Sequence, residues 1–290
     1  VTYSQTKKAD SLKVMLPLIS GIERADVLYD VAFELVDSDY NLSLSYGRKA
    51  RNAAKNIGDS LRIVKAGRIT ALAFRRLEML DSSLSLSLQI IPIARRNSFD
   101  DELASLLNGV GLIYNFMAQY DYALEYYFES LEIRKRDGDP FDIGVVSNNI
   151  GLVYLNLGDF DNALIYFRES ASLKIASRFV YDTEIVLNNI ALCYVATEKL
   201  DSAYSYVNKA FRICGDGCSN DFKVNAYFTL GMAALAKRNL SLAEREFLES
   251  YNIAVGSNNK RFQLANLAYL MQIYLDTDRI KLAENCFREA

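Results

Sequence analysis

The chain has 290 residues, 51% of them hydrophobic and 24% charged, and it carries a formal net charge of −3 with no histidine. An acidic chain has no general attraction for nucleic acid, so we expect no partner of that class. Because histidine is the commonest general base and metal ligand near neutral pH, its absence argues against an enzyme, a metal site or a bound cofactor. The sequence also lacks an apolar run of about 18 residues, so we expect no membrane span.

Residues 1–22 form an N-terminal segment, in which we expect a short amphipathic helix over residues 6–16. Leu12, Met15 and Leu16 are its packing residues, and Pro17 ends it. The chain begins with Val1 rather than Met, as it does after a secretory signal is cleaved, although the apolar core of such a signal is not present. We therefore expect a periplasmic or exported location, with a cytoplasmic location as the alternative.

From Val31 onward the sequence repeats every 40 residues without an insertion or deletion. One slot holds Val31, Ala71, Gly111, Gly151, Ala191, Gly231 and Met271. A second slot, twelve residues later, holds Ser43, Ser83, Ala123, Ala163, Ala203, Ala243 and Ala283. Seven copies in one phase are not a chance pattern, although the first two copies are degenerate.

The clearest copy spans residues 148–167 and predicts a helix, a turn at Gly158 and a second helix. Gly151 and Ala163 are small where two helices must meet closely, and Tyr154 and Phe167 fill the space around them. This pattern resembles the tetratricopeptide repeat. The resemblance implies an all-α fold, a right-handed α-solenoid of about seven helix-turn-helix repeats, with the first helix of each repeat on the concave wall.

The repeats form one array over residues 23–290. Its expected copies lie near 24–63, 64–103, 104–143, 144–183, 184–223, 224–263 and 264–290, the last incomplete. First helices are expected over 23–36, 60–77, 100–117, 141–157, 181–197, 221–237 and 261–276, and second helices begin near 40, 80, 120, 160, 200, 240 and 280. Because no polar capping helix follows the last copy, we expect the natural protein to continue beyond Ala290.

The cysteines do not predict a metal site. Cys214 and Cys218 lie in a turn between repeats, where they either close a small disulfide in an oxidising compartment or remain two free thiols. One cysteine pair without histidine is two ligands short of a zinc site. Cys193 falls in a first helix, where a small buried residue is expected.

A basic stripe lies on the first helix of the second repeat. Lys65, Arg68, Arg75 and Arg76 share its concave face, and residues 41–100 hold 11 Lys and Arg against 4 Asp and Glu. Such a stripe suits a carboxylate, an acidic peptide or an acidic partner surface. The alternative is a solvated face whose charges pair internally with Glu78 or Asp100.

Asparagines recur along the same wall in the next three repeats. The residues are Asn108, Asn115, Asn148, Asn149, Asn188 and Asn189. Since an amide both donates and accepts, these side chains suit the backbone of a bound peptide, or alternatively they bond neighbouring helices. Leu152, Leu192 and Met232 add an apolar strip that is either part of an open groove or part of the core.

Together these features predict a non-enzymatic module that binds a peptide or protein segment, with an acidic segment as a candidate, in its concave groove. The repeats resemble the sensor region of bacterial signalling proteins, so the chain is expected to be the sensory or interaction region of a larger protein. The alternative is a structural scaffold for self-association or complex assembly, and thus a homo-oligomer. We expect Lys65, Arg68, Arg75, Asn108 and Asn148 to form one ligand surface, and charge reversal at Arg68 and Arg75 to abolish binding without changing the helical melt.

Overall fold

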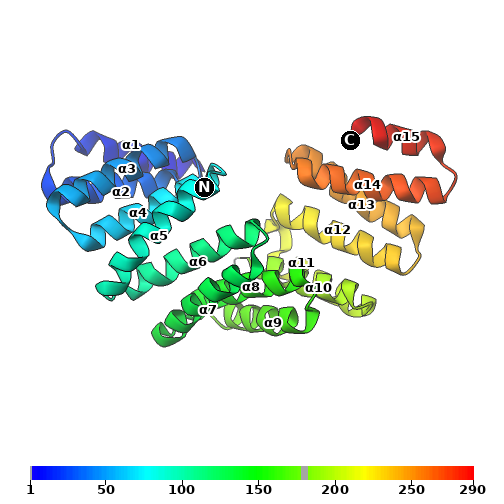
Figure 1. Ribbon diagram of the computed structural model, residues 1–290. Coiled ribbons are helices and arrows are strands. Elements are labelled where there is room, and N and C mark those ends of the chain that lie inside the picture. The colour runs from blue at the N-terminus through cyan, green and yellow to red at the C-terminus, as the bar shows by residue number, and fades with distance from the viewer. Residues whose placement is uncertain (1, 178–181) are drawn as a thin grey trace. The chain divides into compact units, whose positions relative to one another are not determined.

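The computed structural model describes residues 2–177 and 182–290, and this part of the chain is all helical, with no strand (Figure 1). It divides into two compact units, residues 1–139 and 140–290. The first unit holds α1 (Thr2–Met15), α2 (Gly21–Leu35), α3 (Tyr40–Ile57), α4 (Ser60–Arg76), α5 (Leu80–Arg96), α6 (Asp100–Phe116) and α7 (Tyr120–Asp137). The second unit holds α8 (Pro140–Leu157), α9 (Phe160–Ala176), α10 (Thr183–Ala196), α11 (Leu200–Cys214), the 3₁₀ turn η1 (Gly215–Gly217), α12 (Asn220–Ala236), α13 (Leu240–Gly256), α14 (Lys260–Asp276) and α15 (Ile280–Glu289).

Each unit is an α-solenoid of helix pairs, as the period predicts. The second helices begin at Tyr40, Leu80, Tyr120, Phe160, Leu200, Leu240 and Ile280, the slots expected from the sequence. The first helices begin within two residues of their expected starts, except that the start expected at residue 181 lies outside the described residues. Within the units, consecutive first helices pack on one another, α2 on α4 on α6 and α8 on α10 on α12.

The N-terminal helix differs from its expected form. It already begins at Thr2 rather than at residue 6. Leu12 and Leu16 pack against the first repeat as expected, but Met15 does not, because it is 42% exposed. The chain turns directly after Met15, next to Pro17.

The turns inside the repeats share a left-handed backbone residue. Gly158 has φ +75°, which a glycine adopts without steric cost. Five further copies of this slot, Glu78, Ala118, Glu198, Arg238 and Asp278, have φ between 54° and 59°, whereas Ser38 in the first copy does not have a positive φ. The period therefore fixes the turn geometry even where the sequence carries no glycine signal.

Three close contacts between a glycine and a ring hold the helix pairs together. A Cβ on Gly111, Gly151 or Gly231 would lie 2.7, 2.6 and 2.7 Å from the nearest ring atom of Tyr127, Phe167 and Phe247, respectively. All three rings are fully buried. The first-helix glycine is thus required by the aromatic residue that crosses it on the second helix.

Buried serines add a second periodic contact. The hydroxyls of Ser130, Ser170 and Ser250 donate to the carbonyl oxygens of Ala104, Gly144 and Val224, each 26 residues earlier, at 2.8, 2.6 and 2.9 Å. Each bond joins a second helix to the first helix of the same repeat. A buried hydroxyl is satisfied without a side-chain partner in this way.

Candidate functional site

The four basic residues predicted to bind a ligand, Lys65, Arg68, Arg75 and Arg76, all lie on α4 in the first unit. Arg68 Nε donates to Glu102 Oε2 on α6 at 2.6 Å, and Arg68 Nη2 donates to the hydroxyl of Tyr29 on α2 at 3.3 Å. Glu102 is only 5% exposed. Arg68 is therefore held by neighbouring repeats on both sides, by partners other than the expected Glu78 or Asp100.

Arg76 is also paired within the protein. Its Nη2 donates to Asp37 Oδ1 at 2.8 Å, and both side chains are about half exposed. An ion pair of that exposure contributes little to stability and exchanges readily with solvent. Arg76 thus remains accessible to an anion in a way that Arg68 does not.

An acidic stripe on α2 faces the basic stripe on α4. Asp26 accepts two hydrogen bonds from Arg62 at 2.8 Å each. Burial raises the pKa of Asp30, the neighbouring Asp26 raises it further, and the charge of Lys65 acts in the opposite sense. Sequence reasoning missed this stripe, although the i, i+4 spacing of Asp26 and Asp30 was a signal for it.

Lys65 and Arg75 make no close ion pair among the described residues. Burial lowers the pKa of Arg75, the neighbouring Arg76 lowers it further, and Tyr127 acts in the opposite sense. The hydroxyl of Tyr127 is buried without a hydrogen-bond partner, and burial raises its pKa. Arg75 and Lys65 are both half-buried, and the charge of Lys65 acts on Asp30 of the facing helix α2.

The asparagines of the second unit are largely internal. Asn149, Asn188 and Asn189 are 8%, 2% and 7% exposed. Asn189 Nδ2 on α10 donates to Asn148 Oδ1 on α8 at 3.2 Å, and the Oδ1 of Asn188 is buried without a partner. These contacts favour the alternative in which asparagines bond neighbouring helices. Asn148 is half-buried, so it is the most accessible of these four asparagines.

Asn108 and Asn115 lie on α6 in the first unit, and both are half-buried. Each already has an interaction within the protein. Because Asn148 belongs to the second unit, the expectation that all these residues form one ligand surface stays a prediction.

The apolar strip of the second unit is partly accessible. Leu152 on α8, Leu192 on α10 and Met232 on α12 occupy one repeat slot on three consecutive first helices, and all three are half-buried. Leu152 and Met232 pack against the buried cluster of the same unit. The strip is therefore partly packed against the core and partly exposed to solvent. It lies on the same face of the first helices as Asn148.

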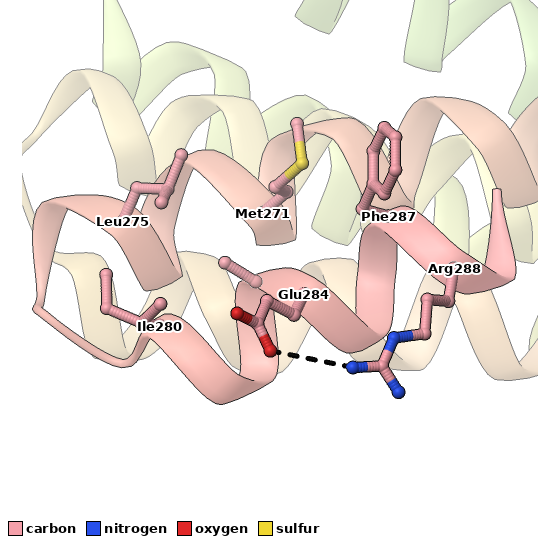
Figure 2. A pocket seen from close by; sticks show the side chains of 7 residues that line it. Met271, Leu275, Ile280, Glu284, Phe287 and Arg288 are labelled. Atoms are coloured by element: carbon pink, nitrogen blue, oxygen red, sulfur yellow. Dashed lines mark ion pairs between the residues drawn. The ribbon is translucent and has the colours of Figure 1, made fainter.

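An apolar hollow lies on the last helix pair. Met271, Leu275, Ile280, Ala283, Glu284, Phe287 and Arg288 line a space of about 380 Å³ (Figure 2). Phe287 is 75% exposed, and Ile280 and Leu275 are about half exposed. Glu284 and Arg288 form an i, i+4 ion pair at its edge. The hollow was missed as a site, although Phe287 occupies the slot of the buried Phe167 and Phe247.

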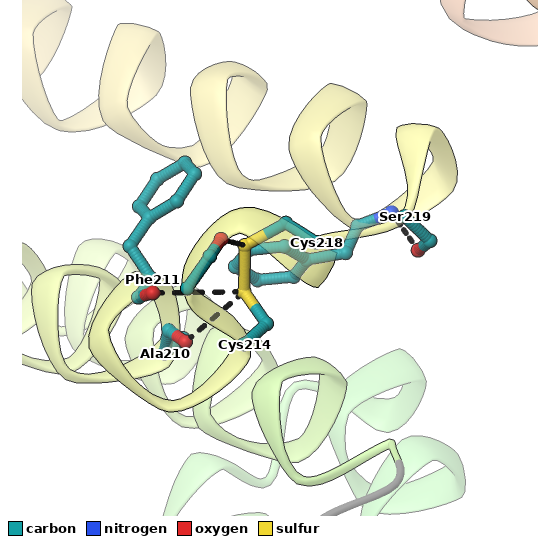
Figure 3. The surroundings of a disulfide bond; sticks show 7 residues. Ala210, Phe211, Cys214, Cys218 and Ser219 are labelled. Carbon is teal, nitrogen blue, oxygen red and sulfur yellow. Dashed lines mark hydrogen bonds between the residues drawn. A yellow bond between two sulfur atoms is a disulfide. The ribbon is translucent and has the colours of Figure 1, made fainter.

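The alternative that the sequence left open at the cysteines is settled in favour of a disulfide. Cys214 and Cys218 are bonded, with Cα atoms 4.9 Å apart, at the end of α11 (Figure 3). Their sulfurs lie 3.4 and 3.0 Å from the carbonyl oxygens of Ala210 and Gly215. These are contacts rather than hydrogen bonds in the oxidised form, because a disulfide sulfur carries no proton. Within the described residues, no group of three or more cysteines and carboxylates could hold a metal.

None of the helices in the described part of the chain is long and apolar enough to cross a bilayer.

The site residues described above give two candidate binding elements. One is the face of Asn148, Leu152, Leu192 and Met232 in the second unit, and the other is the accessible cation of Lys65 in the first.

Comparisons with known proteins agree with this picture. Residues 101–176 match the family model described as tetratricopeptide repeat. The apo form of the quorum sensor NprR from B. thuringiensis is 17% identical, with a TM-score of 0.77, over 99% of this chain and 81% of that one. A Rap protein complexed with competence and sporulation factor is 13% identical, with a TM-score of 0.71, over 97% of this chain and 77% of that one.

A third solved structure has a larger architecture. A signal transduction ATPase with numerous domains and a tetratricopeptide repeat sensor, from Pyrococcus horikoshii, is 18% identical, with a TM-score of 0.72, over 90% of this chain but 42% of that one. A comparison with curated protein sequences gives no significant match. At these identities the structures show the fold alone, an α-solenoid of helix pairs, and the family model shows tetratricopeptide repeats over residues 101–176.

Proposed function

We propose that the chain is a non-enzymatic sensory module that binds a peptide segment along the first helices of its second unit. The observation that carries the proposal is the strip of Leu152, Leu192 and Met232, which stays half-buried on three consecutive helices next to Asn148. The fold is that of a protein-interaction module, and structures of this fold include a quorum sensor and a protein complexed with a signalling factor.

The strip suits one face of a bound segment. Apolar side chains at a repeat spacing accept the alternate side chains of an extended peptide, or the apolar face of an amphipathic helix. Asn148 accepts a hydrogen bond from Asn189 through its Oδ1, and this bond does not use its own amide donors. Donors of that kind pair with peptide carbonyls of any sequence, so the strip supplies the selectivity.

An acidic partner is proposed separately for the first unit, where Lys65 supports it. Arg68 is engaged by Glu102, and the charge of Arg75 acts on Tyr127. Lys65 forms no ion pair within 4 Å among the described residues, although its charge acts on Asp30 of α2. A lysine ammonium of this kind acts as a point charge for a carboxylate.

The test is selection of peptides from a random displayed library, followed by calorimetric titration of the selected peptide. Leu192→Gln should weaken binding at least about tenfold, because it places an amide in the apolar strip. The matched control is Ile165→Gln on the second helix α9, where the side chain is 59% exposed. Equal binding by both variants, or no selectable peptide at all, would overturn the proposal.

A second candidate function is self-association through the last helix pair. The exposed face of Ile280 and Phe287 supports it, because apolar patches of this kind mark interaction surfaces. Light scattering over a concentration range tests it directly. A strict monomer, or association unaffected by Phe287→Asp, would contradict this function.

We also propose an exported location, since disulfides persist in oxidising compartments and Cys214–Cys218 is bonded. Cell fractionation with thiol trapping tests the location. Recovery of the protein in a reducing compartment with both thiols free would refute it.

A further inference from the structure

A cavity on the second-helix side of the first unit has no part in the function proposed above. It is a shallow hollow of about 420 Å³ that is open to solvent, and it lies over α3, α4 and α5. Its lining residues are Arg48, Arg51, Thr70, Phe74, Asp81, Ser82, Ser85, Leu86 and Gln89. The floor is apolar and fixed, because Phe74 and Leu86 are buried. The rim is polar, and a space of this size accommodates a small molecule.

Arg51 is the unusual residue of the cavity. Its Nε atom is buried and has no hydrogen-bond partner. Burial lowers the pKa of Arg51, and no neighbouring carboxylate raises it again. The Nε atom has no accessible surface, but Arg51 as a whole is half-buried and lines the hollow, so its other guanidinium N–H groups are the donors that a ligand can reach.

The same cavity holds further donors on two facing helices. Arg48 lies one turn before Arg51 on α3, and its guanidinium carbon is 5.1 Å from the centre of the Phe74 ring. It forms no ion pair among the described residues. Ser82 and Ser85 lie one turn apart on α5 and face the cavity with Gln89, whose Nε2 donates to Ser85 Oγ at 3.4 Å. Two guanidinium groups therefore face two hydroxyl groups across the cavity.

We propose that this cavity binds the oxyanion group, a carboxylate or a phosphate, of a small molecule between the guanidinium of Arg51 and the hydroxyls of Ser82 and Ser85. Guanidinium groups match the geometry of both oxyanions with paired N–H donors. The hydroxyls supply the remaining donors from the opposite helix. Phe74 and Leu86 form the apolar floor against which the rest of the molecule lies.

Asp81 is the one carboxylate at the cavity, and it sits exposed in the first turn of α5. Its charge opposes an anion, and it makes no close ion pair with either arginine. Asp81 therefore lowers the affinity of the hollow for an anion without contacting the anion itself. Removing its charge should strengthen binding, which is the opposite of what a structural ion pair would show.

The experiment uses the full chain and follows the Nε–H signal of Arg51 by NMR. Inorganic phosphate and acetate are titrated separately at constant ionic strength, which separates the two sources of oxyanion. Saturable movement of the Arg51 signal is expected with at least one of them. Arg51→Gln should lower the affinity at least about tenfold, measured on the Ser82 and Ser85 amide signals. Asp81→Asn should raise it about threefold.

The matched control is Arg96→Gln, an exposed arginine on α5 outside the cavity, and it should leave the titration unchanged. Helical melts of each variant separate lost binding from lost folding. An Arg51 signal that neither anion moves, or a response equal in Arg51→Gln and Arg96→Gln, would overturn the proposal. The peptide titration of the second unit is independent of these measurements, so failure of either proposal leaves the other distinguishable.

Discussion

Arg68 and Glu102 join two neighbouring repeats through an ion pair whose carboxylate is almost fully enclosed, with Arg68 Nε 2.6 Å from Glu102 Oε2. Breaking such a pair leaves an uncompensated charge in the packed interface between α4 and α6. The pair therefore matters more to the fold than its partly exposed arginine suggests.

The first prediction concerns this pair. Arg68→Met should lower the free energy of unfolding by about 2–3 kcal/mol, because the carboxylate of Glu102 stays buried alone. Replacing both residues, as in Arg68→Met with Glu102→Leu, should recover most of the loss. Urea unfolding followed by circular dichroism measures both. An additive double variant would show that the pair is not coupled.

This prediction corrects the expectation that charge reversal at Arg68 leaves the helical melt unchanged. A reversed charge would face Glu102 directly and destabilise the first unit. Lys65 is the better probe of ligand binding, because its substitution breaks no close ion pair among the described residues.

The second prediction concerns the contact of Gly151 with Phe167. Gly151→Ala should destabilise the second unit by about 1–3 kcal/mol, since the new Cβ would meet the buried ring. The control is Gly144→Ala, whose Cβ would lie 3.3 Å from Lys174 Cγ and 3.4 Å from the backbone oxygen of Ser170, farther than the ring of Phe167 lies from a Cβ on Gly151. It should cost clearly less in the same thermal melt. Equal losses would mean that ring contact is not the cause.

The third prediction compares glycine-to-alanine substitutions at two positions, where we expect opposite effects on the free energy of unfolding. Gly158→Ala should cost about 1 kcal/mol, because φ is +75° while the space around the Cβ is open. Gly109→Ala also meets open space but lies inside α6, so it should stabilise by about 0.5–1 kcal/mol. Denaturant midpoints decide the signs. Two losses, or two gains, would contradict the assignment to backbone conformation.

The fourth prediction concerns the cysteines. The native protein should show no fast-reacting thiol, because Cys214 and Cys218 are bonded and Cys193 and Cys286 are buried. Burial raises the pKa of Cys193 to about 12, so its thiolate is scarce at neutral pH. Mild reduction should expose two thiols and cost at most about 2 kcal/mol, since the closed loop is short.

A thiol count with Ellman's reagent before and after reduction checks this prediction. The variant with Cys214→Ser and Cys218→Ser should be insensitive to reductant in the same melt. Four fast thiols in the untreated protein would refute it.

The fold was largely predictable because the period constrains it at many positions at once. Gly151, Ala163 and Phe167 recur in phase, so helix starts and turns follow from counting residues. Single contacts between repeats were not predictable in the same way. Arg68 meets Glu102, 34 residues later, because of how α4 and α6 are offset along their axes, and a repeat pattern does not encode that offset.

The binding residues were harder to predict than the fold. Asn148 and Asn189 share a pattern that serves a peptide or a neighbouring helix equally well, and their mutual hydrogen bond appears only once the helices are placed. Arg51 was not singled out, because a basic residue on a second helix carries no signal until its burial is known.

The serine bonds have a consequence for how the chain can change in length. Ser170 and Ser250 reach back 26 residues to the same backbone position of their own repeats. Excising residues 164–203 would join Ala163 to Tyr204 within a helix. Because this removes one whole repeat, each later residue would keep its slot in the repeat and its face of the helix. Excising one residue fewer would rotate everything that follows by about 100° about that helix axis. A change of length within a helix therefore preserves the repeat register only in steps of 40 residues.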